Sequence, residues 1–104
     1  MDLNLMVLAG HLTVNAEVRQ FDSGGLMIRY LVTVSVDHPR HRVDVIPASL
    51  WDPSEELIES PGMKGDGIWL CGSLQRRYVE STYGRRSTLE LVAEQVKVTE
   101  GVNV

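Results

Sequence analysis

The sequence has little of what secreted and membrane proteins carry. Cys71 is the only cysteine among 104 residues, so no internal disulfide can form and a reducing cytosol is the expected compartment. Residues 1–8 contain no basic segment followed by a long apolar run, and no later stretch has the length and hydrophobicity of a membrane-spanning helix. We therefore expect a cytoplasmic protein without a signal peptide or a membrane segment.

Motifs for catalysis and for metal binding are missing as well. His11, His38 and His41 do not have the spacing of a recognised metal site, and the single cysteine adds little to them. No glycine-rich phosphate-binding loop is present. We expect no metal, no cofactor and no enzymatic activity, and at this length we expect a single domain that spans residues 1–104.

Positive charge is scarce overall but concentrated. The chain has 14 acidic and 10 basic residues and a net charge of -4, which as a single number argues against a nucleic-acid partner. Acidic side chains crowd residues 52–66. Four of the ten basic residues lie within eleven positions, and they are Arg76, Arg77, Arg85 and Arg86. A basic surface beside an acidic one is therefore expected.

Residues 68–98 have the pattern of a long β-hairpin. An apolar run leads to Arg76 and Arg77, a turn follows at Tyr83, and a second strand-like run reaches Val98. The arginines flank the turn on both strands, and pairs of arginines that faced each other across it would repel. The pattern predicts a hairpin with a basic, aromatic-containing tip.

Three strands are expected before this hairpin. Residues 5–21 form an apolar segment that bends or bulges at Gly10. Residues 26–36 alternate between apolar and other side chains at a period of two, which indicates a half-buried strand. Residues 43–51 form the third strand, in which Pro47 is expected at an edge or a bulge because it cannot donate to a ladder.

One short helix is expected after the third strand. Asp52 has the chemistry of an N-cap, Pro53 suits the first helical position and Glu55 falls three residues after the cap. Pro61 and Gly62 should end the helix after about two turns.

This order of elements indicates an all-β protein with an OB-fold. That fold is a five-stranded Greek-key barrel, and the helix is expected between strands 3 and 4. The fold commonly binds oligonucleotides or oligosaccharides. We expect the barrel to cover about residues 4–98 and residues 99–104 to form a loose C-terminal end.

Several segments resemble the bacterial single-stranded DNA-binding protein family. In chain order they are residues 8–13 with their small-residue bend, Glu17-Val18-Arg19, Ile46-Pro47 followed by Trp51, Lys64-Gly65, Gly72-Ser73-Leu74-Gln75 with Arg77, and residues 89–96. Each motif alone is weak, but six in the right order with compatible spacing are specific. The resemblance covers roughly residues 4–98 and implies binding of single-stranded DNA without sequence preference, in replication, recombination or repair.

Two positions and one segment depart from that family's pattern. Val45 and Val79 stand where the family usually has aromatic residues, and Tyr78 lies one position early. Family members usually continue into a flexible tail whose acidic tip recruits replication proteins, and this sequence contains no such tail. The resemblance implies a dimer or a tetramer and replication proteins as further partners, and how those partners are recruited stays open.

Aromatic and basic side chains are the candidates for binding DNA, because single strands are held by stacking and by cations along the phosphates. Trp51, Tyr78 and Tyr83 are the stacking candidates. The structural alternatives are a place in the core or in an interface for Trp51 and cross-strand contacts for the tyrosines. A charged edge that prevents aggregation is the alternative for the basic hairpin. The candidates for phosphate contacts are Arg76, Arg77, Arg85 and Arg86, and secondarily Arg29, Arg40 and Arg42.

Trp69 and Cys71 are candidates for an oligomer interface. They alternate with Ile68 and Leu70, so the fourth strand has apolar residues on both faces. One face can pack on the core while the other meets another subunit. The alternative is an inner strand that the helix covers.

Three functions remain open at this point. The favoured one is stoichiometric binding of single-stranded DNA by a nucleoid-associated protein of the bacterial cytoplasm. The second is a primosome-type accessory protein that binds both single-stranded DNA and partner proteins. The third is an OB-fold assembly module with little DNA affinity, which Val45 and the net charge of -4 motivate.

Overall fold

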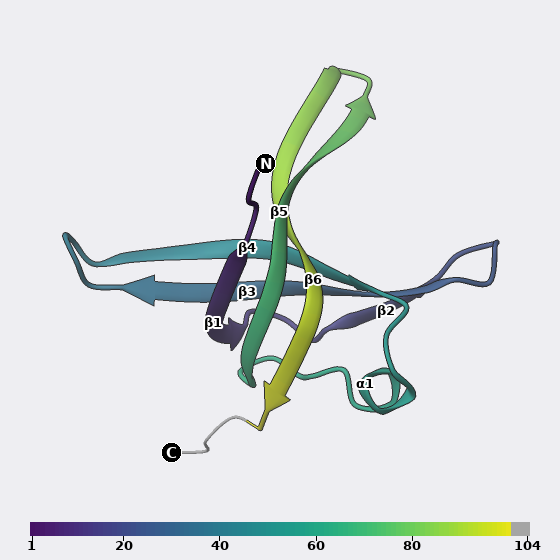
Figure 1. Cartoon of the computed structure of the whole chain (residues 1–104), viewed down its shortest axis with the longest axis horizontal. Helices are drawn as coiled ribbons and strands as arrows, with labels where there is room; N and C mark the ends of the chain where they lie inside the picture. Colours follow the sequence, from purple (N-terminus) through teal and green to yellow (C-terminus); the bar gives the residue numbers. More distant parts are fainter. Residues whose placement is uncertain (101–104) are drawn as a thin grey trace.

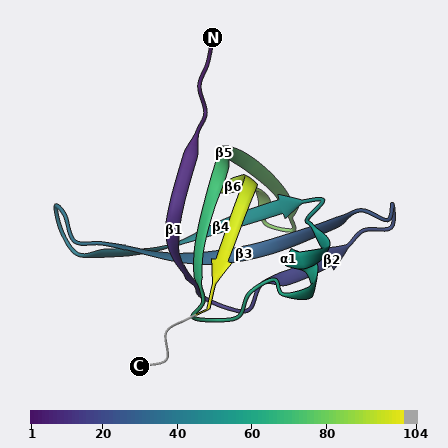
Figure 2. The ribbon, with the colours of Figure 1, turned by 60° about the horizontal axis from the view of Figure 1, so that its bottom comes forward.

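The structure is a computed structural model and describes residues 1–100. Its elements are ordered along the chain as β1 (Met6–Leu12), β2 (Glu17–Gln20), β3 (Leu26–Val36), β4 (Arg42–Trp51), α1 (Glu55–Glu59), β5 (Gly67–Ser81) and β6 (Gly84–Thr99) (Figure 1). The predominance of strands confirms the all-β prediction. Figure 2 shows residues before β1 running away from the strands.

Five strands close into a barrel, as the OB-fold prediction requires. The sheet order is β1-β5-β6-β4-β3-β2, and an additional pairing of β1 with β3 closes the ring. Closure depends on Gly10, because a Cβ at this position would overlap the Thr33 carbonyl oxygen. The bend predicted at Gly10 is therefore the place where β1 passes from its pairing with β5 to its pairing with β3.

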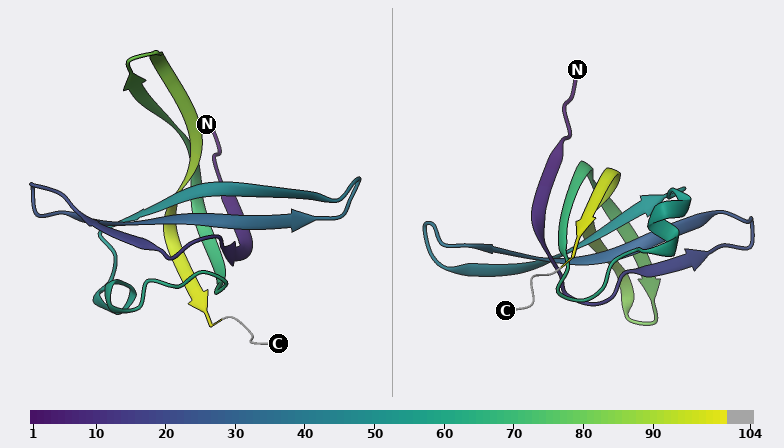
Figure 3. Two further views of the ribbon diagram at one scale, coloured as in Figure 1. Left: turned by 180° about the vertical axis from the view of Figure 1, so that it is seen from behind. Right: turned by 90° about the horizontal axis from the view of Figure 1, so that it is seen from below.

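The helix lies between the fourth and fifth strands of the chain, not between the third and fourth as predicted. The difference arises because the segment predicted as one bent strand is two strands, β1 and β2, separated by residues 13–16. β2 lies outside the ring and, within residues 1–100, pairs only with β3. Figure 3 shows α1 close to the end of the barrel where β6 finishes.

The prediction of the helix start was wrong. Ser54 is the N-cap, and its hydroxyl accepts a hydrogen bond from the Leu57 backbone N–H at 3.3 Å. Asp52 instead has a φ of 52°, in the left-handed region where a short side chain that bonds locally is tolerated. The end of the helix before Pro61 agrees with the prediction.

The core is built from the predicted inward faces of the strands. The largest fully buried side chains are Tyr30, Ile28, Leu70, Leu91 and Val32. They come from β3, β5 and β6, and the cross-strand pairs of β3 and β4, such as Ile28 with Leu50, point to the same side. Among the described residues, Pro47 lies where β4 has only β3 as a neighbour, because β4 pairs with β6 through residues 48–50.

β5 and β6 form one continuous hairpin. One part of it belongs to the barrel, and the other part projects from the barrel. The ladder runs from Gly67 with Thr99 to Ser81 with Gly84, and a register shift between Cys71 and Gly72 leaves one extra residue on β6. Residues 75–81 of β5 and 84–90 of β6, here called the arm, extend beyond the other strands (Figure 1). The predicted long hairpin is confirmed.

The C-terminal prediction is partly wrong. β6 continues to Thr99, which pairs with Gly67, so the loose end expected from residue 99 does not begin there. Residues 101–104 of the predicted loose end lie outside the described residues.

Candidate nucleic-acid interface

The outward face of β4 presents Trp51 beside the end of β2. Alternation along β4 places Trp51 opposite to the buried Ala48 and Leu50, as predicted, and its side chain is 51 % exposed. Burial of Trp51 in the core, one of the two structural alternatives, is therefore wrong, whereas a place in an interface stays an alternative.

Trp51 already has an aromatic partner. The ring of Phe21, which follows β2, stacks on it with the centroids 5.2 Å apart and the planes inclined by 19°. Phe21 is held in place because its backbone N–H donates to the Gly25 carbonyl and its carbonyl accepts from Gly24. The rings of Trp51 and Phe21 together form an exposed aromatic surface, here called the platform.

A groove of about 470 Å³ adjoins this platform. Its volume is within the range of small-ligand sites, roughly 300–1,000 Å³. The walls come from the platform, from the adjoining strands β2, β3 and β4, and from the base of the arm. The lining residues are Arg19, Phe21, Met27, Ser49, Trp51, Gln75, Arg76, Arg77, Glu90 and Val92.

Three arginines line the groove, but their charges are not equally available. The Arg19 guanidinium donates to Glu17 Oε1 at 2.8 Å, and this bond, followed by the charge of Arg19, lowers the pKa of the Glu17 carboxyl. Arg76 donates to the uncharged Ser87 hydroxyl at 2.9 Å. Within residues 1–100, neither Arg76 nor Arg77 has an ion pair. The two arm arginines therefore retain an uncompensated charge for a phosphate.

The four arm arginines do not face each other, contrary to the repulsion expected from the sequence. In the register of the arm, Arg76 lies opposite Leu89 and Arg85 lies opposite Glu80. On the other face, Arg77 lies opposite Thr88 and Arg86 lies opposite Val79. The arm therefore presents two arginines on each face, and no two of these four lie directly opposite each other, although Arg77 and Arg86 are diagonal neighbours.

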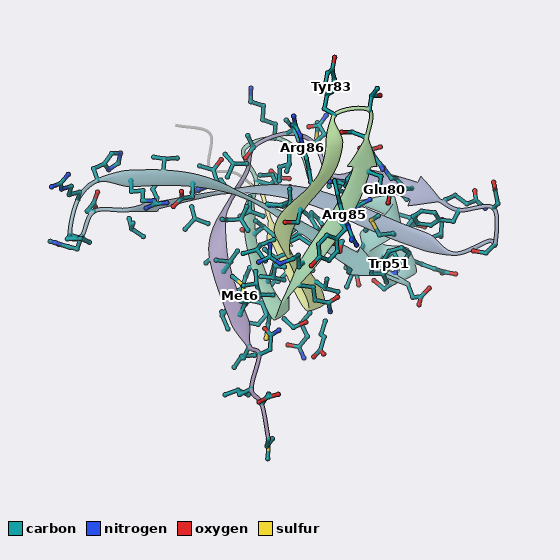
Figure 4. The ribbon with its side chains drawn as sticks, turned by 90° about the horizontal axis from the view of Figure 1, so that it is seen from above. Met6, Trp51, Glu80, Tyr83, Arg85 and Arg86 are labelled. Carbon is teal, nitrogen blue, oxygen red and sulfur yellow. The ribbon has the colours of Figure 1, made fainter. Side chains whose placement is uncertain are left out.

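The arm tyrosines differ in their surroundings. The Arg85 guanidinium lies 4.2 Å from the centroid of the Tyr78 ring, which is a cation–π contact. Tyr83 is in the two-residue turn at the tip, is 91 % exposed, and points away from the arm in Figure 4. Val79, where the family resemblance leads one to expect an aromatic residue, is exposed on the face opposite to Tyr78.

The secondary arginine candidates are dispersed. Arg29 lies opposite Ser49 on the outward face of β3, next to the groove but not in its lining. Arg40 is exposed in the connection between β3 and β4, and Arg42 donates to Asp44 at 2.9 Å. Figure 1 shows the β3–β4 connection and the arm as separate projections. The structure therefore groups Arg76 and Arg77 with Trp51, but not Arg40 or Arg42.

Trp69 and Cys71 lie on the outward face of β5, as predicted from their alternation with the buried Ile68 and Leu70. Their cross-strand neighbours on β1 are Ala9 and Val7. The side chains of Val7 and Trp69 are 55 % and 39 % exposed. These four residues, here called the β1–β5 face, form an apolar surface away from the groove, and α1 leaves Trp69 uncovered.

A larger hollow of about 730 Å³ lies elsewhere, lined by residues such as Asn15, Pro61, Gly62 and Lys64. It has no aromatic residue and includes acidic side chains, so it lacks both features that hold a single strand. No group of three or more potential metal ligands occurs within residues 1–100. The same part of the chain has no helix that is long and apolar enough to span a membrane.

Sequence reasoning missed several residues of the groove. Phe21 was placed only as the end of the first strand, and Arg19 only as part of a family motif. Both reach the groove because β2 pairs with the outer end of β3, where Arg19 lies opposite Met27. The one usable signal was the position of Phe21, a large apolar residue directly before the Asp22-Ser23-Gly24 turn, where burial was not expected. Gln75 and Glu90 likewise appeared only within family motifs, and Ser49 carried no signal.

The comparisons with known proteins agree with this architecture. Residues 3–99 match the family described as the single-strand binding protein family. The chain is 29 % identical over 102 residues to the single-stranded DNA-binding protein of Treponema pallidum (strain Nichols), a match that covers 93 % of this chain and 58 % of that protein. It is 27 % identical over 75 residues to single-stranded DNA-binding protein 1 of Nostoc sp. and to the single-stranded DNA-binding protein of Anabaena variabilis, covering 72 % of this chain and 63 % of each relative.

The chain thus spans about three fifths of the length of these curated relatives. Because the family match includes all of β1 to β6, it covers every element of the barrel and the arm. The chain belongs to the single-strand binding protein family.

Proposed function

We propose that this protein binds single-stranded DNA stoichiometrically and without catalysis. The observation that carries the proposal is the exposed Phe21–Trp51 platform beside a groove that two uncompensated arginines, Arg76 and Arg77, also line. Flat side chains for the bases and cations for the phosphates are what a single strand requires. The relatives of this chain are named for binding single-stranded DNA, which supports the same conclusion.

The path proposed for the strand runs from the platform to the arm. A base stacks on the exposed side of the Trp51 and Phe21 rings, and stacking contributes about 1–3 kcal/mol per base. The following phosphates meet Arg76 and Arg77, and then Arg85 or Arg86 farther along the arm. Because the arginines alternate between the two faces of the arm, one strand contacts one pair more closely than the other.

The biological setting is proposed from the family. Binding that depends on stacking and phosphates protects exposed strands during DNA replication, recombination or repair, in the bacterial cytoplasm at the nucleoid. Replication proteins are proposed as further partners. A primosome-type role would use the same surface for DNA and a partner protein.

The experiment is a titration of fluorescently labelled oligo(dT) with the protein at low and moderate salt, with a duplex of equal length as the control. The expected result is binding of the single strand that weakens steeply with salt, and much weaker binding of the duplex. Absence of binding to oligo(dT) at low salt would contradict the proposal and favour an assembly module with little DNA affinity.

We also propose that the protein forms a homo-oligomer, a dimer or a tetramer, through the β1–β5 face. From Met6 to Gly10, β1 has β5 as its only neighbour within residues 1–100, so a backbone edge lies beside the exposed Val7 and Trp69. Replacing Trp69 by Arg should shift the mass measured by light scattering toward the monomer. An unchanged oligomer would remove this face from the interface.

A further inference from the structure

The groove contains one residue that a purely phosphate-binding surface would not have. Glu90, in β6, is partly buried in the lining between the arm and the platform. None of the ion pairs formed within residues 1–100 includes it, although Arg76 and Arg77 line the same groove. An uncompensated carboxylate repels a phosphate at this place, whereas it accepts hydrogen bonds from a base.

A second acceptor lies directly across the ladder. Gln75 is the cross-strand partner of Glu90, so both side chains are on the same face. Gln75 Nε2 donates one of its two N–H groups to the Ser73 hydroxyl at 3.2 Å, which leaves Oε1 as an acceptor and the other N–H as a donor for a ligand. The wall therefore offers the Glu90 carboxylate and the Gln75 amide oxygen as acceptors, and of the two residues only Glu90 is purely an acceptor.

The floor of the groove adds an unpaired hydroxyl. Ser49 is 3 % exposed and lines the groove two residues before Trp51, on the same face of β4. Its Oγ has no hydrogen-bond partner within residues 1–100. Because this oxygen is itself buried, it is not exposed to a ligand in the groove, and the contacts to a base come from Glu90 and Gln75.

We infer that this wall of the groove reads the edge of one base and favours bases with an exocyclic amino group over thymine. Cytosine presents an N4 amino group, which Glu90 accepts, whereas thymine presents the O4 carbonyl at the corresponding position. Thymine therefore brings an acceptor against a carboxylate. The platform supplies stacking for every base, so the preference is confined to one position of an otherwise sequence-tolerant strand.

This inference rests on the proposed binding of single-stranded DNA, and its test separates the two. The affinities for oligo(dC) and oligo(dT) of equal length are measured with the unchanged protein, with Glu90→Gln and with Glu94→Gln. Glu94, the extra residue of β6 at the register shift, is exposed and outside the groove, so its variant controls for the same change in net charge. Glutamine offers both a donor and an acceptor, so it accommodates either base.

The expected result is that the ratio of oligo(dC) to oligo(dT) affinity falls about fivefold or more in Glu90→Gln and stays unchanged in Glu94→Gln, because an amino group donated to a carboxylate is lost as a discriminating contact. Comparing ratios removes the intrinsic difference in flexibility between the two homopolymers. Equal ratios in all three proteins, with binding intact, would overturn the inference and leave the proposed function standing. Absence of binding to both oligonucleotides would overturn both.

Discussion

The two halves of the β5–β6 hairpin share one ladder but differ in the burial of their side chains. The half within the barrel contributes Leu70 and Leu91, which are fully buried, whereas in the arm Tyr78 and Leu89 are exposed. Hydrogen bonds between strands continue through both halves, so pairing alone does not distinguish them. The difference indicates that burial in the lower half stabilises the fold, while the upper half is free to carry charge for a ligand.

Of the changes in either half of the hairpin, reversing the charge of the arm should lower the affinity for DNA most. In a variant with Arg76, Arg77, Arg85 and Arg86 all replaced by Glu, oligo(dT) affinity should fall by roughly two orders of magnitude or more, because each lost phosphate contact reduces both affinity and the slope against salt. Thermal unfolding should change little, since these side chains line no core. Fluorescence anisotropy at several salt concentrations measures the first effect.

Two double variants locate the strand on the arm. Replacing Arg76 and Arg85 by Glu alters one face, and replacing Arg77 and Arg86 alters the other. One pair should weaken binding clearly more than the other. Equal losses of affinity would mean that the DNA strand does not contact one particular face of the arm. The charge of the arm would then act only at long range.

A substitution in the barrel half should lower the stability of the protein and leave its DNA affinity unchanged. Leu70→Ala removes a side chain with 0 % exposure, so the free energy of unfolding should fall by about 2–5 kcal/mol. At temperatures where the variant stays folded, its affinity for oligo(dT) should match that of the unchanged protein. Urea unfolding measures the stability, and a loss below 1 kcal/mol would contradict the assignment of Leu70 to the core.

The aromatic platform should contribute less than the whole arm. Trp51→Ala should weaken oligo(dT) binding by about 1–3 kcal/mol, the contribution of one stacked base, and Phe21→Ala should weaken it by a smaller amount because Trp51 remains. Trp69→Ala is the matched control, since Trp69 lies on the β1–β5 face. If Phe21→Ala leaves the affinity unchanged, Phe21 supports neither the base nor the position of Trp51.

The last effect is confined to alkaline pH and concerns Tyr30, whose burial raises the pKa of its hydroxyl to about 12. The folded protein keeps this proton more tightly than the unfolded chain, whose tyrosines titrate near pH 10, so stability is fully present below pH 10 and falls as pH rises toward 12. The loss should be on the order of 2 kcal/mol. Tyr30→Phe should lose less stability over the same pH interval, and an identical loss in both proteins would assign it to other groups.

The fold was predictable because period-two alternation is a local property. Ile28, Tyr30 and Val32 face the core for the reason that their spacing indicates. The N-cap was not, since Asp52 and Ser54 have similar capping chemistry and only the backbone after Trp51 decides between them.

The groove was only partly predictable for a related reason. Trp51 and Arg77 are visible as an aromatic and a charge on predicted outward positions. Phe21 and Glu90 join them through pairings between distant strands, and sequence spacing does not encode such pairings. The register shift between Cys71 and Gly72 likewise offsets the pairing of the arm by one residue from that of the barrel half, and so decides which side chains face each arginine.

The most direct test of the central claim is photocrosslinking of the protein to a single-stranded oligonucleotide that carries 5-iododeoxyuridine, followed by mass spectrometry of the crosslinked peptides. Crosslinks at Phe21, Trp51 and Tyr78, lost on competition with unlabelled oligo(dT), are the predicted result. Crosslinks confined to Trp69 or to residues 37–41 between β3 and β4 would contradict the assignment of the groove and the arm as the binding surface.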